Sequence, residues 1–388
     1  MMTKFRFMTA GESHGKGLTA VIDGMVAGLT LTEEYIARDL TRRQSGYGRG
    51  GRMKIEQDYA ELLSGVRHGF TIGSPISLFI QNRDWSNWQE AMSVAPIEKT
   101  IDPITSPRPG HADLAGMMKY GLADIRQVLE RASARETAAR VAVGAIARRF
   151  LEEFDIAVHS HTLCIGEHAA NAIDKVNWNE EEKSPVRCAD KAAAKAMMTA
   201  IDEAKAAGDT LGGISEIVAI GVPIGLGSHV HWDRRLDGRI AQAIMSIQAI
   251  KAVEIGDGFA IAHKRGSKSH DIIVPATRKG TYSWRRPTNR AGGIEGGISN
   301  GESIVVRAAI KPIATLTSSL PSIDLKTKAK VKAHHERSDV CVVPATGVVA
   351  EAMLAIVLAD AMLEKFGGDH LRETTANYRR YLVSLPYK

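Results

Sequence analysis

Two helical segments constrain the fold most, because their side chains must be buried against something. Residues 345–366 (ATGVVAEAMLAIVLADAMLEKF) are mostly apolar and predict a buried helix. The longest helical pattern runs over 113–154, and its second half places Ala138, Val141 and Ala145 at helical spacing. These side chains are small enough for close packing. We therefore expect both helices in the interior.

The segments around these helices alternate between strand and helix patterns. Strands are predicted over 4–8, 16–25, 59–66, 74–82, 155–168, 212–225 and 302–312, with two short ones within 251–262. Helices are predicted over 31–44 with Thr32 as the N-cap, within 178–210 and over 233–250. Motifs from both halves of the chain look like parts of one site. The sequence therefore predicts one α+β domain spanning 1–388.

The charge balance favours small anionic ligands. The net charge is +6 and the pI is near 9.1, which suits either nucleic acid or small acidic substrates. Aromatic residues are only 5% of the chain, and its basic residues form no K/R-rich runs, so base stacking is disfavoured. No secretory h-region and no apolar run near the roughly 20 residues of a membrane helix is recognised. The three cysteines have no C-x-x-C spacing. These features predict a cytoplasmic protein with no membrane or nucleic-acid partner.

GESHG, residues 11–15, fits the G-x-S-x-G pattern of hydrolase nucleophile elbows. An elbow leads from a strand into a helix, whereas the pattern after Gly15 predicts another strand. Ser13 is therefore disfavoured as a nucleophile. His14 is the better candidate, held by glycines that let the backbone approach a ligand.

Glycines also mark the loop 45–52 (SGYGRGGR), which contains G-x-G-x-x-G by its spacing alone. A dinucleotide fingerprint follows a strand and opens a helix, but this loop follows a helix and precedes polar residues. We predict a flexible basic loop, which an RNA-binding protein of the RGG type would also contain.

Four segments combine an ionisable side chain with a turn: 11–15, 108–113 (RPGHAD), 292–301 (GGIEGGISNG) and 335–345 (HERSDVCVVPA). His14 follows Glu12, and His111 precedes Asp113 at a predicted helix start, so each imidazole has a neighbour that can orient it. Basic residues at turns and helix ends suit phosphate and carboxylate recognition. They are Arg42, Arg43, Arg49, Arg52, Arg131, Arg135, Lys311 and Arg337.

The sequence also contains closely spaced pairs of like residues. His159 with His161, and His229 with His231, would each place two imidazoles on one face of a strand, but no carboxylate or cysteine cluster accompanies them, so no metal site is predicted. Arg131 and Arg135 have i,i+4 spacing on the predicted helix, where they would repel each other unless an anion lies between them.

In sequence order, these motifs resemble the chorismate synthase family over almost the whole chain. The matching segments are GESHG, RRQSGYGRGGR, RPGHAD, RASARETAARVAVGAIA, VEIGDGF, AGGIEGGISNG and RSDVC. The resemblance implies a lyase that converts 5-enolpyruvylshikimate 3-phosphate to chorismate by trans-1,4 elimination of phosphate. It implies reduced FMN as cofactor, NADPH as a possible reductant source, and a β-α-β sandwich in which antiparallel sheets enclose a central layer of helices. A homotetramer is also implied.

The resemblance assigns roles to individual residues. His14 would protonate the departing phosphate, His111 would protonate or stabilise the anionic reduced flavin, and Asp339 would help move a proton from the flavin. Ser13 and Ser133 would orient these steps. Flavin contacts would come from Arg131, Ala132, Ser133, Gln248, Ala249, Gly296, Lys311, Pro312, Ile313, Ala314, Thr315 and Arg337. Substrate or NADP contacts would come from Arg43, Arg49 and Arg135.

Two departures from the family pattern bear on these roles. Many relatives have serine where this chain has Ala132, and some read RHDPC where this chain reads RSDVC. The second change keeps Asp339 but removes a neighbouring histidine. No independent nucleotide-binding fingerprint is recognised, so an external flavin reductase is favoured over self-reduction with NADPH. A basic RNA-binding protein and a serine hydrolase at Ser13 are the competing functions.

Overall fold

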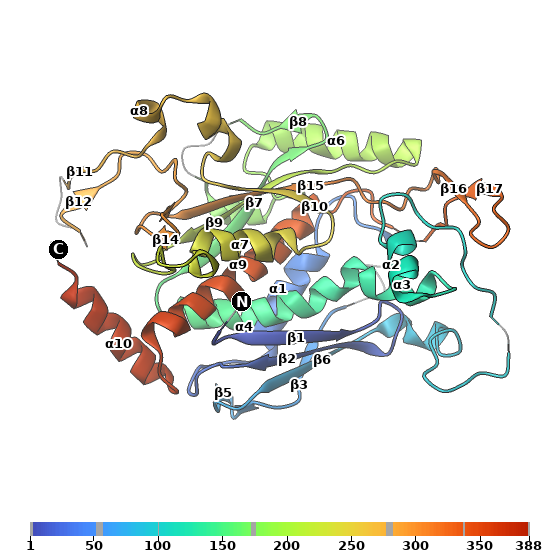
Figure 1. Ribbon diagram of the computed structural model, residues 1–388, viewed down its shortest axis with the longest axis horizontal. Helices are drawn as coiled ribbons and strands as arrows, with labels where there is room; N and C mark the ends of the chain where they lie inside the picture. Colours follow the sequence, from blue (N-terminus) through green and yellow to red (C-terminus); the bar gives the residue numbers. More distant parts are fainter. Residues whose placement is uncertain are drawn as a thin grey trace.

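The computed structural model describes residues 3–51, 57–99, 101–171, 176–276, 282–336 and 338–386 (Figure 1). Two antiparallel sheets and a set of long helices form its core. The α+β class predicted from the sequence is confirmed. The helices are α1 (Glu33–Gln44), α2 (Asp113–Tyr120), α3 (Arg126–Ala132), α4 (Thr137–Glu152), α5 (Trp178–Glu182), α6 (Lys191–Ala207), α7 (Leu236–Met245), α8 (Gly266–Ser269), α9 (Val343–Phe366) and α10 (Leu371–Ser384).

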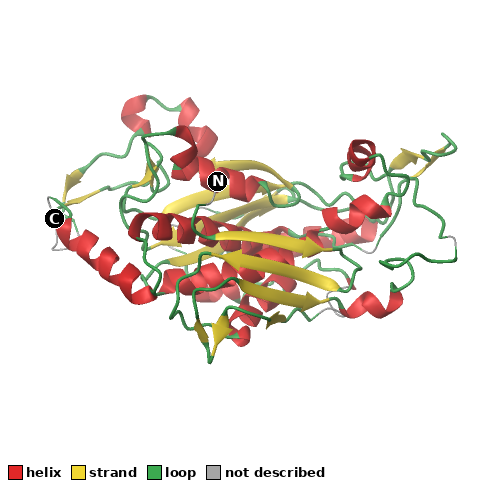
Figure 2. Cartoon of the chain, turned by 60° about the horizontal axis from the view of Figure 1, so that its bottom comes forward, coloured by secondary structure: helices red, strands yellow, loops and turns green. Residues whose placement is uncertain are grey.

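The first sheet has the strand order β1-β2-β6-β3. Its strands are β1 (Arg6–Gly11), β2 (Gly17–Asp23), β6 (Ile76–Gln81) and β3 (Ala60–Leu62), all antiparallel to their neighbours. Alternation buries Leu18, Ala20 and Ile22 on one face, whereas Met8 and Val21 are exposed. Figure 2 shows this sheet in front of the helices that pack on it.

The second sheet has the order β10-β15-β9-β7-β8. Its strands are β10 (Ile250–Ile255), β15 (Ile304–Ile310), β9 (Gly213–Ile220), β7 (Ala157–Ile165) and β8 (His168–Ala169). Four two-stranded pairs lie outside both sheets: β4 (Val66–Arg67) with β5 (Phe70–Thr71), β11 (Val274–Pro275) with β12 (Trp284–Arg285), β13 (Ile294–Glu295) with β14 (Ile298–Ser299), and β16 (Pro321–Ile323) with β17 (Lys330–Lys332).

The helices pack on both sheets and on one another (Figure 1). Helices α1 and α4 contact the first sheet, α9 contacts β7 and β9, and α7 contacts β10. Helix α4 also packs along α9, where a side chain at Gly144 would place its Cβ only 2.3 Å from the Cβ of Ala352. The small residues foreseen in 113–154 thus permit the closest helix contact of the core.

Helix α9 is the one described helix that is long and apolar enough to cross a membrane by length and composition. The expectation that no apolar run approaches that length is therefore wrong. An 18-residue window of α9 has a mean hydropathy of 1.8, yet all of it is buried inside the fold. Sheets and helices cover this helix on all sides, as its all-round apolar surface requires.

Three other predictions are corrected by the structure. The helical pattern 113–154 is broken at Gly121 and Ser133 into α2, α3 and α4. The second short strand predicted within 251–262 is a 3₁₀ turn, and residues 229–231 lie in a loop, not on a strand. Helix α10 was not predicted. In contrast, Thr32 caps α1 as predicted, because its hydroxyl accepts a hydrogen bond from the Tyr35 N–H.

Candidate active site

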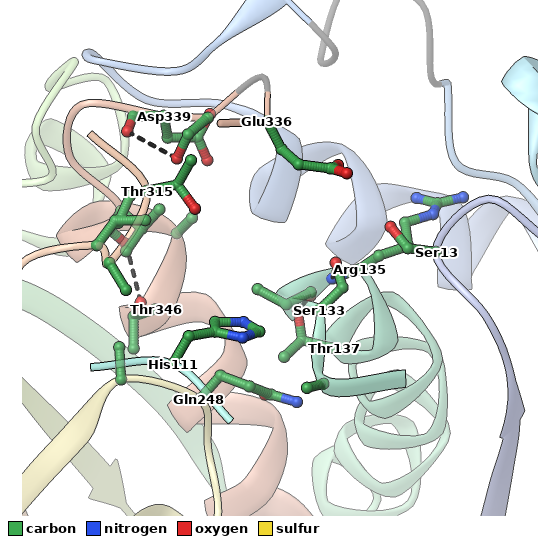
Figure 3. A pocket seen from close by; sticks show the side chains of 18 of the residues that line it. Ser13, His111, Ser133, Arg135, Thr137, Gln248, Thr315, Glu336, Asp339 and Thr346 are labelled. Carbon is green, nitrogen blue, oxygen red and sulfur yellow. Dashed lines mark hydrogen bonds between the residues drawn. The ribbon is translucent and has the colours of Figure 1, made fainter. Parts of the chain in front are cut away.

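A cavity of about 450 Å³ lies where loops from both halves of the chain meet (Figure 3). Its volume falls within the roughly 300–1,000 Å³ of small-molecule sites. Among the described residues, six Lys or Arg side chains and two carboxylates line it. They are Arg43, Arg49, Arg108, Arg135, Lys251, Lys311, Glu336 and Asp339. The excess of positive charge suits an anionic ligand.

His14 lies in the turn between β1 and β2 and lines the cavity. Gly11 makes this turn possible, because it has a φ of +109° and a Cβ there would lie 2.3 Å from the Gly17 carbonyl oxygen. The turn leads into a strand, so Ser13 does not have the strand-to-helix setting of a nucleophile elbow. Ser13 is buried and lines the cavity beside His14.

The partner of the His14 ring is Glu130 of α3, not the neighbouring Glu12. The Nδ1 atom of His14 lies 2.9 Å from Oε1 of Glu130, and the His14 backbone N–H donates to Oε2 at 2.8 Å. The His14 ring also stacks on Trp88, with centroids 4.0 Å apart. Glu130 therefore fixes one edge of the His14 imidazole, and Trp88 covers one of its faces.

His111 lies immediately before α2 and lines the same cavity. Its Nδ1 contacts Oδ1 of Asp113, as its position in RPGHAD predicts. Arg108 also donates to Asp113 and lies 3.1 Å from the ring. Burial opposes ionisation of Asp113, but hydrogen bonds from His111 and Arg108 hold its pKa well below its usual range. An ionised Asp113 requires a proton on Nδ1, which leaves Nε2 for a ligand.

Two predicted arginines share one buried carboxylate behind the cavity wall. Arg43 and Arg135 both pair with Asp58, and Nε of Arg135 donates to Oδ1 of Asn82 at 2.9 Å. The amide of Asn82 in turn donates to the Glu12 and Gly15 carbonyls. Burial lowers the pKa of Arg43, and Asp58 counteracts that effect. Asn82 thus connects the arginine pair to the GESHG turn.

Asp339 lines the cavity on the segment before α9. Its carboxylate accepts from the Gly50 N–H and pairs with Arg49 at 3.0 Å. The Gly-rich loop is therefore bound to the fold through this residue. Arg43 of α1 interacts electrostatically with Arg49 and Asp339, and the loop's described arginine, Arg49, lines the cavity.

Ser133 breaks the helical run between α3 and α4, where its hydroxyl accepts from the Arg135 N–H at 3.2 Å. Ala132 and Ser133 line the cavity. The predicted repulsion between Arg131 and Arg135 is wrong, because the break sends them in different directions: Arg131 donates to the Thr9 carbonyl.

The turn between α7 and β10 supplies Gln248 and Ala249 to the cavity. Ala249 has a φ of +70°, a strained value for a residue with a side chain. The amide nitrogen of Gln248 donates to Glu136 at 3.3 Å. Within the described residues, the buried Oε1 of Gln248 has no hydrogen-bond partner. It is an acceptor positioned for a donor from a ligand.

The segment after β15 supplies Lys311, Ile313, Ala314 and Thr315 to the cavity. The Lys311 ammonium donates to the Gly110 carbonyl, and burial together with Lys251 lowers its pKa. Arg108 donates to the Thr315 hydroxyl at 3.0 Å. This segment therefore supports the turn that carries His111.

The structure does not bring every predicted residue to the cavity. Arg131 faces the β1 backbone, Gly296 is exposed at the tip of the β13–β14 hairpin, and Pro312 is exposed. Arg42 pairs with Glu182 and Glu351 and does not line the cavity. Arg52 and Arg337 lie outside the described residues. The other predicted site residues line the cavity.

Sequence reasoning missed Glu130, Trp88, Asn82 and Asp58, and it did not give Arg108 a role. The signal for Arg108 was its place in RPGHAD. The other four lie far along the chain from their partners; Glu130, for example, is 116 residues from His14. No local pattern connects residues at such separations.

The histidine pairs set aside as metal ligands have other partners. His159 stacks on Trp178, His161 lies 3.1 Å from Glu216, and His231 lies 2.6 Å from Asp233. Within the described residues, no group of three or more His, Cys, Asp or Glu side chains could hold a metal ion. The three cysteines are free.

Comparison with known proteins gives one consistent family. The sequence model of chorismate synthase matches residues 5–363. A chorismate synthase of Moorella thermoacetica is 58% identical, covering 98% of this chain and 100% of its own. One of Aquifex aeolicus is 54% identical, covering 97% of each chain. A crystal structure of chorismate synthase aligns with a TM-score of 0.79 at 44% identity, covering 99% of this chain and 98% of the other.

Proposed function

Since the chain belongs to the chorismate synthase family, we propose that the cavity is where it eliminates phosphate from 5-enolpyruvylshikimate 3-phosphate. The protein is a carbon–oxygen lyase of aromatic amino acid biosynthesis. One observation carries the assignment of the site. A single cavity gathers two buried or half-buried imidazoles, each paired with a carboxylate, and six cationic side chains from distant parts of the chain.

The cations recognise the substrate. It carries a phosphate and two carboxylates, whose charge must be offset in a site that excludes water. Arg43, Arg49 and Arg135 lie together on one side of the cavity, and their planar guanidinium groups suit such oxygens. Pairing of Arg43 and Arg135 with Asp58 fixes these side chains before the substrate arrives.

His14 is the general acid for the departing phosphate. Its Nδ1 is engaged by Glu130, so the proton available to the ligand is the one on Nε2. Trp88 covers one face of the ring and shields it from water. Ser13, beside it in the turn, orients the phosphate by hydrogen bonding.

The residues of the cavity fit a flavin. The orphaned Oε1 of Gln248 is an acceptor for a ring N–H, Lys311 supplies a cation, and apolar Ile247, Ile313 and Val349 line the cavity. Ala132, Ser133, Ala249, Ala314 and Thr315 would complete this wall. Reduced FMN, when bound, supplies the transient electron density that lets the carbon–oxygen bond break without net oxidation.

His111 holds a proton next to that wall. Nδ1 of His111 contacts Asp113, and Nη2 of Arg108 lies 3.5 Å from Nε2, so a ring N–H and the Arg108 cation together would stabilise negative charge on a bound group. Asp339 accepts a proton released during the elimination, and Ser133 orients the neighbouring groups. Arg49 pairs with Asp339 at 3.0 Å and would hold that carboxylate in place for the transfer.

Five broader features are part of the proposal. The helices that contact both sheets would form the central layer of a β-α-β sandwich, and residues 1–388 would form one domain, since one apolar cluster joins both sheets. A homotetramer would follow from the family resemblance, and a cytoplasmic location from the cysteine usage of the sequence. NADPH would reach the flavin indirectly, through an external flavin reductase.

Phosphate release under anaerobic conditions tests the function. Chemically reduced FMN should support turnover of the substrate, and oxidised FMN alone should not. Adding NADPH to oxidised FMN distinguishes self-reduction from an external reductase. Turnover in that mixture would mean that the chain reduces its own flavin. No release with authentic reduced FMN would refute the function.

The described part of the basic loop gives the RNA-binding alternative less support than the pI and the RRQSGYGRGGR motif suggested. Arg42 pairs with Glu351 and Glu182, Arg43 with Asp58, and Arg49 with Asp339, so these arginines are engaged within the fold. Binding of generic RNA that weakens steeply with salt would restore it.

A further inference from the structure

The carboxylate that contacts the His14 ring lies outside the cavity wall, so its own contribution has to act through His14. Glu130 is buried, with a side chain 1% exposed, and does not line the cavity. It receives the His14 backbone N–H at 2.8 Å, faces Nδ1 of His14 at 2.9 and 3.1 Å, and accepts from Arg126 at 3.0 Å. Both carboxylate oxygens are thus bound to one turn and one arginine.

Two aromatic contacts complete this arrangement. The His14 ring lies nearly parallel to Trp88, at an interplanar angle of 25°. The Arg126 guanidinium lies 4.8 Å from the centre of the Trp88 ring, and Trp88 Nε1 donates to Asp84. The imidazole therefore cannot turn about its bonds without breaking the Glu130 contact or the stack.

Other charged side chains lie beside the contact between Glu130 and His14. Arg126 and Glu130 form one pair, and Glu336, whose partner is His334, lies 3.7 Å from Arg126. Burial opposes ionisation of Glu336, but His334, His14 and Arg126 together keep its pKa below its usual range. Two carboxylates and one guanidinium thus lie beside His14, and Glu130 is the carboxylate that contacts its ring.

We propose that Glu130 is a positioning residue that holds a proton on Nδ1 of His14 and thereby directs Nε2 into the cavity as the nitrogen that transfers protons. A carboxylate can only accept at this distance, so Nδ1 must be the donor. After Nε2 gives up its proton, the ring keeps Nδ1–H and accepts the next proton on Nε2. This inference rests on the proposed role of His14 as the acid.

The first test is made on the ligand-free protein. In proton NMR, the Nδ1–H of His14 should give a downfield signal, identified by its loss in His14→Ala. Glu130→Gln should remove that signal or shift it upfield. Glu12→Gln removes an exposed carboxylate of the same turn and should leave the signal unchanged. An unaltered signal in Glu130→Gln would overturn the inference, whatever the turnover shows.

The second test is the pH profile of kcat. Glu130→Gln removes the charge of the side chain. It should move the alkaline limb of the kcat profile to lower pH by roughly 1–3 units, with KM changed less than about twofold. Glu130→Asp keeps the charge one methylene further away and should give an intermediate limb. A purely structural role would lower kcat equally at all pH values or leave the limb in place, and either result contradicts the proposal. Near-normal turnover of His14→Ala would instead refute the proposed acid while leaving the NMR result to judge Glu130.

Discussion

The two imidazole–carboxylate pairs of the cavity use the same chemistry but arise in different ways. His111 and Asp113 are two residues apart at the start of α2, whereas His14 and Glu130 are 116 residues apart. The His14 side chain is 8% exposed and that of His111 is 20% exposed. Trp88 makes the difference, because it covers the face of His14.

An arginine accompanies each pair, again with a difference. Arg108 bonds to Asp113 and also contacts the His111 ring, whereas Arg126 bonds to Glu130 and lies over Trp88 instead of the ring. The two rings therefore differ in what holds them. His14 contacts a carboxylate and an aromatic face, whereas His111 contacts a carboxylate and a guanidinium.

The largest expected effect comes from deleting either imidazole. His14→Ala and His111→Ala should each lower kcat by about 10²- to 10⁴-fold, the usual contribution of general acid–base catalysis, while FMN binding survives. Anaerobic phosphate release measures kcat, and flavin fluorescence measures binding. His231→Ala, at an exposed histidine paired with Asp233, is the control. Comparable turnover in His231→Ala and either variant would remove that histidine from the mechanism.

The next largest effect is expected on the free energy of unfolding, at the carboxylate that holds His111. Asp113→Asn leaves Arg108 buried without its carboxylate and should lower the free energy of unfolding by about 3–5 kcal/mol at pH 7. Because the folded pKa of Asp113 is depressed, its stabilisation is present above the unfolded value of about 3.9 and is lost as pH falls through the folded value. Urea unfolding should therefore show the two proteins converging below about pH 4. If the unfolding free energies of the wild type and Asp113→Asn differed by the same amount from pH 7 to pH 3, this account would be contradicted.

A smaller effect should be confined to the His14 side. Asn82→Ala removes the donor to the Glu12 and Gly15 carbonyls and the acceptor of Arg135, at a cost of about 1–3 kcal/mol of stability. Thermal or urea unfolding measures it, and Asn179→Ala, at an exposed asparagine of α5, is the control. NMR signals of His14 should shift and those of His111 should not. The reverse pattern would break the assignment of Asn82 to the GESHG turn.

The smallest effect tests the shielding of His14. Trp88→Leu removes a stacked ring pair worth about 0.5–1.5 kcal/mol, so kcat should fall by no more than roughly tenfold. Trp232→Leu, at an exposed tryptophan, should leave kcat unchanged. A Trp88→Leu enzyme with wild-type kcat and an unaltered His14 signal would show that the stack has no part in positioning the ring.

The sequence predicted local features well and long-range ones poorly. The Thr32 cap, the strand after GESHG and the buried helix 345–366 each follow from a few neighbouring residues. The run 113–154 was read as one helix because its apolar spacing continues through Ser133. The break there depends on the Ser133 hydroxyl, which captures the backbone N–H of Arg135 in place of the regular helix bond.

For the site, the sequence by itself determined the motifs, both histidines, the cationic character and the partner of His111. That partner lies two residues away, within reach of local geometry. Only the tertiary structure decided that Glu130, and not the adjacent Glu12, holds His14, and that Asp58 and Asn82 join the arginines to the same turn. The physical reason is that these contacts are made by packing α3 and β6 against the β1–β2 turn, and packing brings together residues whose separation along the chain carries no local pattern.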